Sequence, residues 1–255
     1  MIKYINLFLF LALGAMLLAS DLNWRTFEEA LKIAKTEDKV ILVDFFTDWC
    51  GWCKKMDSET YSNKEIVDLL HKDFVTVKIN PEKQGSITLG DQTLSWERFA
   101  AEVGVTGYPA TAFFTPNFQL IDLVPGYYDP GNMELLLNFM SKEMYQKISF
   151  QDYRLFNEVQ TLASIENSSP ELDFVLGYFL LRFFGEKEKA YKSFKSALDK
   201  ELQNKELYAA LHLSANENEQ ESNNWLTKAE ERGYTNESQL DDLVVRYVQD
   251  IFAAE

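Results

Sequence analysis

One stretch of the sequence decides the fold: residues 40–53 read VILVDFFTDWCGWC. Its first half, residues 40–46, is a continuous apolar and aromatic run, short enough for a strand that is buried on both faces. We therefore expect a central strand of a parallel sheet there. Two cysteines, Cys50 and Cys53, follow directly, and residues 54–60 contain no Gly or Pro. This predicts a helix that begins close to the cysteines.

The spacing of the cysteines indicates thiol-disulfide exchange. They are the only 2 cysteines in the chain, which is too few for a disulfide scaffold, and so short a bridge would constrain the unfolded chain very little. In exchange, one thiolate attacks a disulfide and a second nearby thiol resolves the mixed disulfide. Because the start of a helix lowers the pKa of a thiol, we expect Cys50 to attack and Cys53 to resolve.

A metal site is another common use of such a cysteine pair. A zinc site would need two more Cys or His ligands, and the chain offers only His71 and His212, far apart and without a ligand pattern. We expect no metal, and no cofactor beyond a redox-active disulfide between Cys50 and Cys53. Since the chain also lacks a dinucleotide-binding glycine fingerprint, a partner protein would have to supply reducing equivalents.

The N-terminal residues 1–20 differ from the rest of the chain. Lys3 precedes an uncharged apolar run over residues 5–18, and Ala19 and Ser20 follow. This pattern is typical of a secretory signal peptide, so we expect cleavage and export, to the periplasm of a bacterium. The alternatives are an uncleaved anchor and a buried core helix, and only with an anchor would the protein contact a membrane.

Length and periodicity divide the remainder into two domains. A chain of 255 residues can form two compact units. Strand and helix patterns alternate over residues 21–147, which predicts an α/β sheet covered by helices. Over residues 148–255 only helical periods occur, which predicts an all-α domain of helical hairpins.

Apolar periods, caps and turn signals predict the elements of the α/β domain. A capping box of Thr26 and Glu29 begins a helix over residues 23–35, and a second box of Ser62 and Glu65 begins another helical stretch. The remaining expectations are a strand at 74–79, a loop at 82–93, a helix at 96–103, a strand hairpin at 111–115 and 119–124, and a helix at 132–147.

The helical domain shows an internal pattern. Ser169 and Pro170 are a good helix start. A small-large-small face recurs at Ala190, Phe194 and Ala197 and at Ser222, Leu226 and Ala229. This resembles a tetratricopeptide-type helical hairpin, which would supply a docking surface for a protein partner, and an ordinary helical bundle is the alternative.

Composition excludes one class of partner. Apolar residues make up 46% of the chain and aromatic residues 14%, as in a folded protein. The net charge is -15, from 40 acidic and 25 basic side chains, and no basic patch is present. Since nucleic acid would be repelled, we expect no nucleic-acid partner.

Residues 40–126 resemble a thioredoxin domain at several separated positions. The segment WCGWC at 49–53 resembles the active-site segment of that family, and KIN at 78–80 resembles the end of its next strand. The segment GVTGYP at 104–109 resembles the loop that carries its cis-proline, and Gly126 lies where a glycine borders its substrate-binding surface. The resemblance covers about half of the chain and implies a thioredoxin fold.

The resemblance also implies roles for single residues. Asp44 matches a buried acid that exchanges a proton with Cys53, and Lys78 matches a lysine beside that acid. Each role has an alternative without function: Asp44 could be a strand-end acid in solvent, Pro109 a trans turn proline, and one tryptophan a core residue. The residues expected to contact the substrate are Trp49, Gly51, Trp52, Tyr108, Pro109 and Gly126.

Trp52 departs from the family pattern, which most often has proline at this position. Tryptophan restores a backbone N–H and lacks the fixed φ of proline, so neither the reduction potential nor the direction of electron flow can be taken from the resemblance.

These features predict an exported thiol-disulfide oxidoreductase that reduces or isomerises disulfides of proteins or peptides. An upstream thiol-disulfide electron donor would recharge it. One alternative is an oxidase of the same fold that donates its disulfide. Another is a helical partner-binding or chaperone-like protein with a redox-sensitive thioredoxin scaffold.

Overall fold

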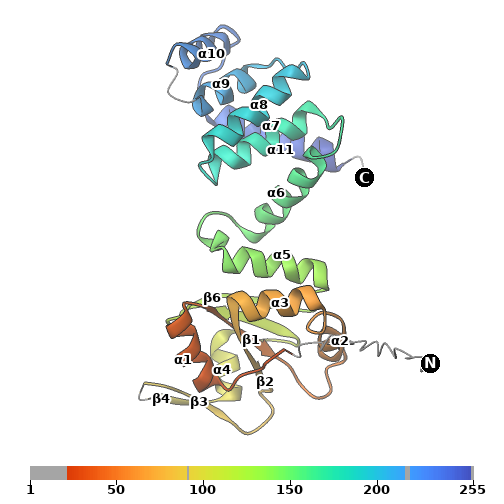
Figure 1. Cartoon of the computed structure of the whole chain (residues 1–255), viewed down its shortest axis with the longest axis vertical. Helices are drawn as coiled ribbons and strands as arrows, with labels where there is room; N and C mark the ends of the chain where they lie inside the picture. The colour runs from red at the N-terminus through yellow and green to blue at the C-terminus, as the bar shows by residue number, and fades with distance from the viewer. Residues whose placement is uncertain (1–21, 91, 216–218, 254–255) are drawn as a thin grey trace, which may run out of the picture. The chain divides into compact units, whose positions relative to one another are not determined.

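The structure is a computed structural model that describes residues 22–90, 92–215 and 219–253. The expected signal peptide at residues 1–20 lies outside these ranges. The described residues form two compact units that divide after Leu137 (Figure 1). The expected domain boundary, after residue 147, lies later in the chain. Within the described ranges, no helix has the length and apolarity needed to cross a bilayer.

A four-stranded mixed sheet forms the centre of the first unit, in the order β2-β1-β5-β6. The strands are β1 (Val40–Phe45), β2 (Phe74–Ile79), β5 (Ala110–Phe114) and β6 (Leu120–Pro125). The central position predicted for β1 is confirmed, because it pairs with a strand on each side. It is parallel to β2 and antiparallel to β5. The expectation of a parallel sheet therefore holds for one neighbour of β1 and is wrong for the other. The predicted hairpin corresponds to β5 and β6.

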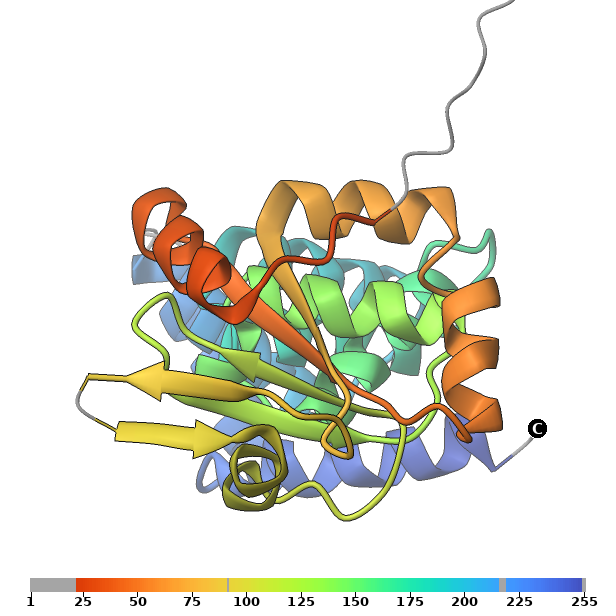
Figure 2. The ribbon, with the colours of Figure 1, turned by 90° about the horizontal axis from the view of Figure 1, so that it is seen from below.

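Helices cover both faces of this sheet (Figures 1 and 2). On one face, α1 (Phe27–Glu37) and α4 (Trp96–Val103) pack their apolar side chains against alternate residues of β1. On the other face lie α2 (Gly51–Glu59), α3 (Lys64–Asp73) and α5 (Pro130–Ser141). Because both faces are covered, β1 has no solvent-facing row, which explains its continuous apolar run.

Two helix starts differ in detail from their predictions. The Thr26 and Glu29 capping box is confirmed, and α1 begins at Phe27 instead of residue 23, because Arg25 pairs with Val77 in an isolated β-bridge. The cap predicted at Ser62 is wrong: the Asn63 side chain accepts from the backbone N–H groups of the first turn of α3. The Ser62 hydroxyl instead donates to the Ser58 carbonyl, 2.6 Å away.

The loop predicted at residues 82–93 contains a second, two-stranded sheet. β3 (Ser86–Leu89) and β4 (Gln92–Ser95) pair antiparallel and are coloured yellow in Figure 2. Ile87 and Leu94 lie opposite each other and are buried in the core between α1 and α4. Apart from this buried pair, every residue of both strands except Leu89 is polar, so the sequence carried too short an alternation to indicate strands.

The helix predicted at residues 132–147 is shorter than expected. α5 ends at Ser141, and a 3₁₀ turn follows at Met144–Gln146. Glu143 has a φ of 53°, which lies in the left-handed region and cannot continue an α-helix. The apolar period alone did not reveal this break.

The second unit contains only helices among its described residues. They are α6 (Phe150–Ala163), α7 (Pro170–Arg182), α8 (Lys187–Asp199), α9 (Lys205–Ser214), α10 (Glu219–Glu231) and α11 (Ser238–Phe252). Ser169 caps α7 and Pro170 lies in its first turn, as predicted. α7 packs on α8 and α9 on α10. A Cβ at Gly177 would lie 2.6 Å from the Phe194 ring, so a glycine is needed where these two helices meet. The tetratricopeptide resemblance stays a prediction.

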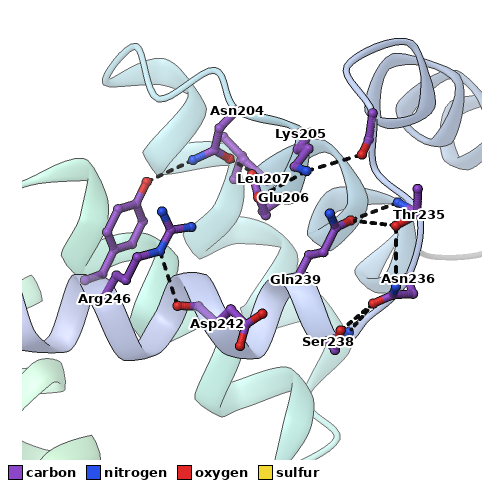
Figure 3. A network of polar contacts seen from close by, with 12 residues as sticks. Asn204, Lys205, Glu206, Leu207, Thr235, Asn236, Ser238, Gln239, Asp242 and Arg246 are labelled. Carbon is purple, nitrogen blue, oxygen red and sulfur yellow. Dashed lines mark hydrogen bonds and ion pairs between the residues drawn. The ribbon is translucent and has the colours of Figure 1, made fainter.

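Polar side chains join α9 to α11 (Figure 3). Asn204 caps α9 by accepting from Leu207 N at 2.7 Å, and its Nδ2 donates to the Tyr247 hydroxyl of α11 at 2.9 Å. The turn before α11 is held by Gln239, whose Oε1 accepts from Thr235 N at 2.8 Å. The Asn204 side chain thus satisfies a backbone N–H at the start of α9 and joins that helix to α11.

Candidate functional site

The site begins where β1 passes into α2. Phe46 N donates to the Ile79 carbonyl at 3.0 Å, which continues the pairing of β1 with β2 by one residue. Cys50 N then donates to the Thr47 carbonyl at 3.2 Å. Cys50 is the N-cap of α2, and its Sγ accepts from Cys53 N at 3.0 Å. The cysteines therefore lie at a helix start, as the sequence predicted.

Cys50 and Cys53 form a disulfide, with their Cα atoms 5.3 Å apart. The two residues are 5% and 3% exposed, although the adjacent Gly51 is exposed. This is the oxidised state of a two-electron couple. A disulfide at the unpaired N–H groups of a helix start can be opened by an incoming thiolate, because those groups stabilise the thiolate that leaves.

Asp44 is buried on the α2 face of β1, at 2% exposure. Its register partner on β2 is Lys78, whose Nζ lies 3.3 Å from Asp44 Oδ2. Burial raises the pKa of Asp44 to about 6, against the opposing effect of Lys78. The alternative of a solvent-exposed strand-end acid is therefore wrong for Asp44.

A second carboxylate binds the same lysine and was not predicted. Asp57 of α2 pairs with Lys78 Nζ, which also lies 4.9 Å from the centroid of the Trp24 ring and 5.0 Å from that of Phe46. One ammonium is thus shared between two carboxylates and three aromatic rings, since the centroid of the Tyr61 ring lies 5.6 Å from it. The spacing of four residues between Cys53 and Asp57 places both on one side of α2, and this was the available signal.

Trp49 lies on the surface beside the disulfide, at 68% exposure. Its indole Nε1 donates to Glu82 Oε1 at 2.9 Å, and its ring meets Tyr108 edge-on at 6.1 Å. Glu82 was not predicted as a site residue. Asn80 positions it, since Asn80 Oδ1 accepts from Glu82 N at 3.0 Å.

Trp52 is also exposed, at 58%, so the core alternative is wrong for both tryptophans. Its ring packs on Tyr127 with the centroids 5.4 Å apart. Lys55 Nζ lies over both rings, 5.2 Å from the centroid of Trp52 and 5.0 Å from that of Tyr127. Tyr127 was not predicted, because only the fold brings the segment after β6 beside α2.

The structure also brings the proline loop into the site. The Tyr108–Pro109 peptide bond is cis, and Pro109 is buried. Gly126 N donates to the Pro109 carbonyl at 2.8 Å. Gly126 has a φ of 90°, a conformation that glycine adopts without strain. The segment that contains Gly126 and Tyr127 is thus joined to the loop.

Across the ranges that the structure describes, no three His, Cys, Asp or Glu side chains come together as a metal site. The described site residues carry a disulfide, carboxylates, aromatic rings and the ammonium groups of Lys78 and Lys55.

Known proteins resemble this chain over its first unit. Residues 27–141 match the family of the thioredoxin-like domain. Human spermatogenesis-associated protein 20 is 33% identical over 103 residues, which are 40% of this chain and 12% of that protein. The disulfide bond reductase DsbH of Chlamydia pneumoniae is 30% identical over 104 residues, 37% of this chain and 57% of that protein.

A solved structure shows a similar extent of likeness. The solution structure of a putative disulphide-isomerase from Bacteroides thetaiotaomicron is 28% identical, covers 47% of this chain and 93% of its own, and has a TM-score of 0.38. The chain thus spans a small part of the human relative and little more than half of the chlamydial one. Residues 27–141 of this chain are therefore a thioredoxin-like domain, and an all-helical region follows it.

Proposed function

We propose that this protein is an exported thiol-disulfide oxidoreductase that reduces or isomerises disulfides of other proteins. The observation that carries the proposal is the Cys50–Cys53 disulfide at the start of α2, after a strand that carries the buried Asp44 carboxylate and with an exposed tryptophan next to each cysteine. The disulfide bond reductase among its relatives supports the reductive direction. The apolar N-terminal segment supports export.

In the reductive direction, the reduced protein gives two electrons to its substrate. The Cys50 thiolate attacks one sulfur of a substrate disulfide, and the other sulfur leaves as a thiolate. The Cys53 thiolate then attacks Cys50 Sγ, which forms the Cys50–Cys53 disulfide and releases the second substrate thiolate. In isomerisation, another substrate thiol displaces Cys50 instead, so the protein remains reduced.

Asp44 would handle the proton in the second step. Cys53 must lose its proton to attack, and an acid with a pKa of about 6 can accept one near neutral pH. Lys78 and Asp57 position the carboxylate through the shared ammonium. An upstream thiol-disulfide donor would return the protein to the dithiol form.

The reduction potential of the Cys50–Cys53 couple tests the direction of electron flow. The purified protein is equilibrated in glutathione buffers of known ratio, and the mass shift after thiol trapping gives the reduced fraction. A potential near roughly -270 mV is expected for a reductase, whereas one near roughly -120 mV would identify the disulfide-donating oxidase instead.

A matched variant shows that the trapped thiols belong to this pair. The chain has only 2 cysteines, so Cys50→Ser combined with Cys53→Ser must remove the mass shift altogether. Turnover of an oxidised protein substrate must disappear in the same variant. Persistent turnover would contradict the assignment of the chemistry to these two residues.

A further inference from the structure

Exposed aromatic side chains flank the disulfide. Trp49 precedes Cys50 and is 68% exposed, and Trp52 precedes Cys53 and is 58% exposed. Among the described residues of the first unit, the third large exposed apolar side chain is Leu120, at 48%. Leu120 pairs with Phe114, which pairs with Ile41 near the start of β1, so it lies at the opposite end of the sheet from the cysteines. The apolar exposure beside the disulfide is therefore a local feature of the reactive end.

Trp52 is held in one position although it is exposed. One part of its ring packs on Tyr127, and Lys55 lies over both rings. The Tyr127 hydroxyl donates to Glu59 Oε2 at 2.8 Å, and this hydrogen bond raises the pKa of Tyr127. Lys55 and Glu59 also lie within 3.8 Å of each other, one helical turn apart. The rest of the Trp52 ring is exposed to solvent, while its contacts with Tyr127 and Lys55 hold the ring in place.

The support is joined to the loop of the cis-proline. Tyr127 follows Gly126, and Gly126 N donates to the Pro109 carbonyl at 2.8 Å. The preceding residue of the loop, Tyr108, meets the Trp49 ring edge-on. An extended chain that reached Cys50 past this loop would therefore present its neighbouring side chains to fixed aromatic rings.

We propose that the Trp52 ring, supported by Tyr127, is a subsite for a large apolar or aromatic side chain next to the reacting cysteine of an extended polypeptide. This rests on the proposed function and names its substrate class. Lys55 and Glu59 are positioning residues, since Lys55 lies over both rings and Glu59 accepts the hydrogen bond of the Tyr127 hydroxyl. Aromatic rings favour aromatic partners beyond the area that they bury. Glutathione disulfide carries no large apolar side chain and gains nothing from the subsite.

A pair of peptide disulfides tests the subsite. Each substrate is a disulfide-linked homodimer of one short peptide, with Phe on both sides of the cysteine in the first and Ser in the second. Attack on either sulfur is then equivalent. The reduced full protein reacts with each under the same conditions, and chromatography follows the released peptide thiol. We expect the Phe peptide to react roughly tenfold faster.

The Trp52→Ala variant should reduce this rate ratio to below about twofold, because the ring that receives the side chain is gone. Tyr127→Phe keeps the ring and removes the hydroxyl that binds Glu59, so it should give an intermediate ratio. Leu120→Ala removes an equally apolar exposed side chain at the far end of the sheet and should retain the full ratio. Each ratio compares two substrates of one variant, so a change in reduction potential cancels.

Two results would overturn the inference in distinguishable ways. If the wild-type protein reacts with the peptides but Trp52→Ala keeps the Phe preference, the subsite is wrong and the proposed function stands. If the wild-type protein reacts with neither peptide nor with glutathione disulfide, the proposed function fails and the subsite fails with it.

Discussion

At Asp44, two opposing effects act on one carboxylate. The ion pair with Lys78 at 3.3 Å favours the charged form, while removal from water at 2% exposure favours the neutral acid. Burial is the larger effect, since the pKa rises from 3.8 to about 6. The nearby Asp57 acts in the same direction, because a second negative charge also disfavours ionisation.

The raised pKa of Asp44 predicts a pH-dependent cost to stability. The folded protein holds this proton to a higher pH than the unfolded chain does, so the stabilisation is fully present below about pH 3.8 and is lost as the pH rises through about 6. Asn mimics the neutral acid. We expect Asp44→Asn to raise the free energy of unfolding of the oxidised protein by roughly 2 to 3 kcal/mol at pH 7.5.

Urea unfolding of the oxidised wild type and Asp44→Asn across pH measures this effect. The gain should shrink toward zero as the pH falls below about 3.8, where Asp44 becomes protonated in both states. Asp48→Asn is the matched control, since Asp48 is exposed and its hydrogen bond to Lys83 lowers its pKa. It should show no gain at pH 7.5, and a gain of equal size there would contradict the burial argument.

The turn between α2 and α3 shows how side chains set the ends of elements. α2 ends at Glu59, and the hydroxyl of the next residue, Thr60, donates to the Tyr128 carbonyl at 2.6 Å. Asn63 then begins α3 by accepting from Glu65 N at 2.9 Å and Ile66 N at 3.3 Å. These two N–H groups belong to the first turn of the helix, where no backbone carbonyl reaches them.

The cap at Asn63 predicts the effect of its removal. Asn63→Ala leaves the first-turn N–H groups of α3 without their acceptor and should lower the free energy of unfolding by about 1 kcal/mol. Ser62→Ala removes the hydroxyl that binds the Ser58 carbonyl instead, and its effect should stay within about 0.5 kcal/mol. Denaturant unfolding of the oxidised protein separates the two. If Ser62→Ala lowers the free energy of unfolding more than Asn63→Ala does, the helix is capped by Ser62, as the sequence predicted, and not by Asn63.

At the scale of the whole molecule, each unit has an interior of its own. The helical unit contains an ion pair between a buried acid and a half-buried lysine: Asp173, 5% exposed, lies 2.6 Å from Lys200 Nζ and accepts from the Ser196 hydroxyl at 2.6 Å. These contacts join α7 to the end of α8. All the described contacts of Cys50 and Cys53 come from the first unit.

Removal of the buried acid should therefore destabilise one unit without a change in the other. Asp173→Ala leaves Lys200 with only the Ser168 hydroxyl and the Ser196 hydroxyl without its acceptor, and should cost the helical unit roughly 1 to 2 kcal/mol. The reduction potential of the Cys50–Cys53 couple should change by less than about 10 mV, because none of its described contacts comes from the helical unit. A change of that size corresponds to a few tenths of a kcal/mol of coupling between the two units. Thermal unfolding and the glutathione titration measure the two effects.

The exposed Asp199 provides the control for this prediction, because Asp199→Ala removes a carboxylate one residue before Lys200. Its effect on stability should stay within about 0.5 kcal/mol. A shift of the reduction potential in Asp173→Ala but not in Asp199→Ala would show that the helical unit acts on the redox site.

The sequence by itself determined the features that depend on neighbours along the chain. The run at residues 40–46 was sufficient for β1, because a strand buried on both faces needs no alternation. The cysteine pair after it was sufficient for the exchange chemistry, since two thiols at this spacing are within reach of each other at the helix start that the sequence also predicted. The cap at Thr26 and the helix start at Ser169 also followed from local patterns.

Only the tertiary structure decided the features that join distant segments. The Asp57 carboxylate on Lys78, the Glu82 carboxylate on Trp49 and the Tyr127 ring under Trp52 are each contributed by another element. The β3–β4 hairpin depends on one buried pair that meets the core of α1 and α4. The burial that raises the pKa of Asp44 likewise depends on all the elements that pack around its side chain. It therefore cannot be predicted from the residues next to Asp44 in the sequence.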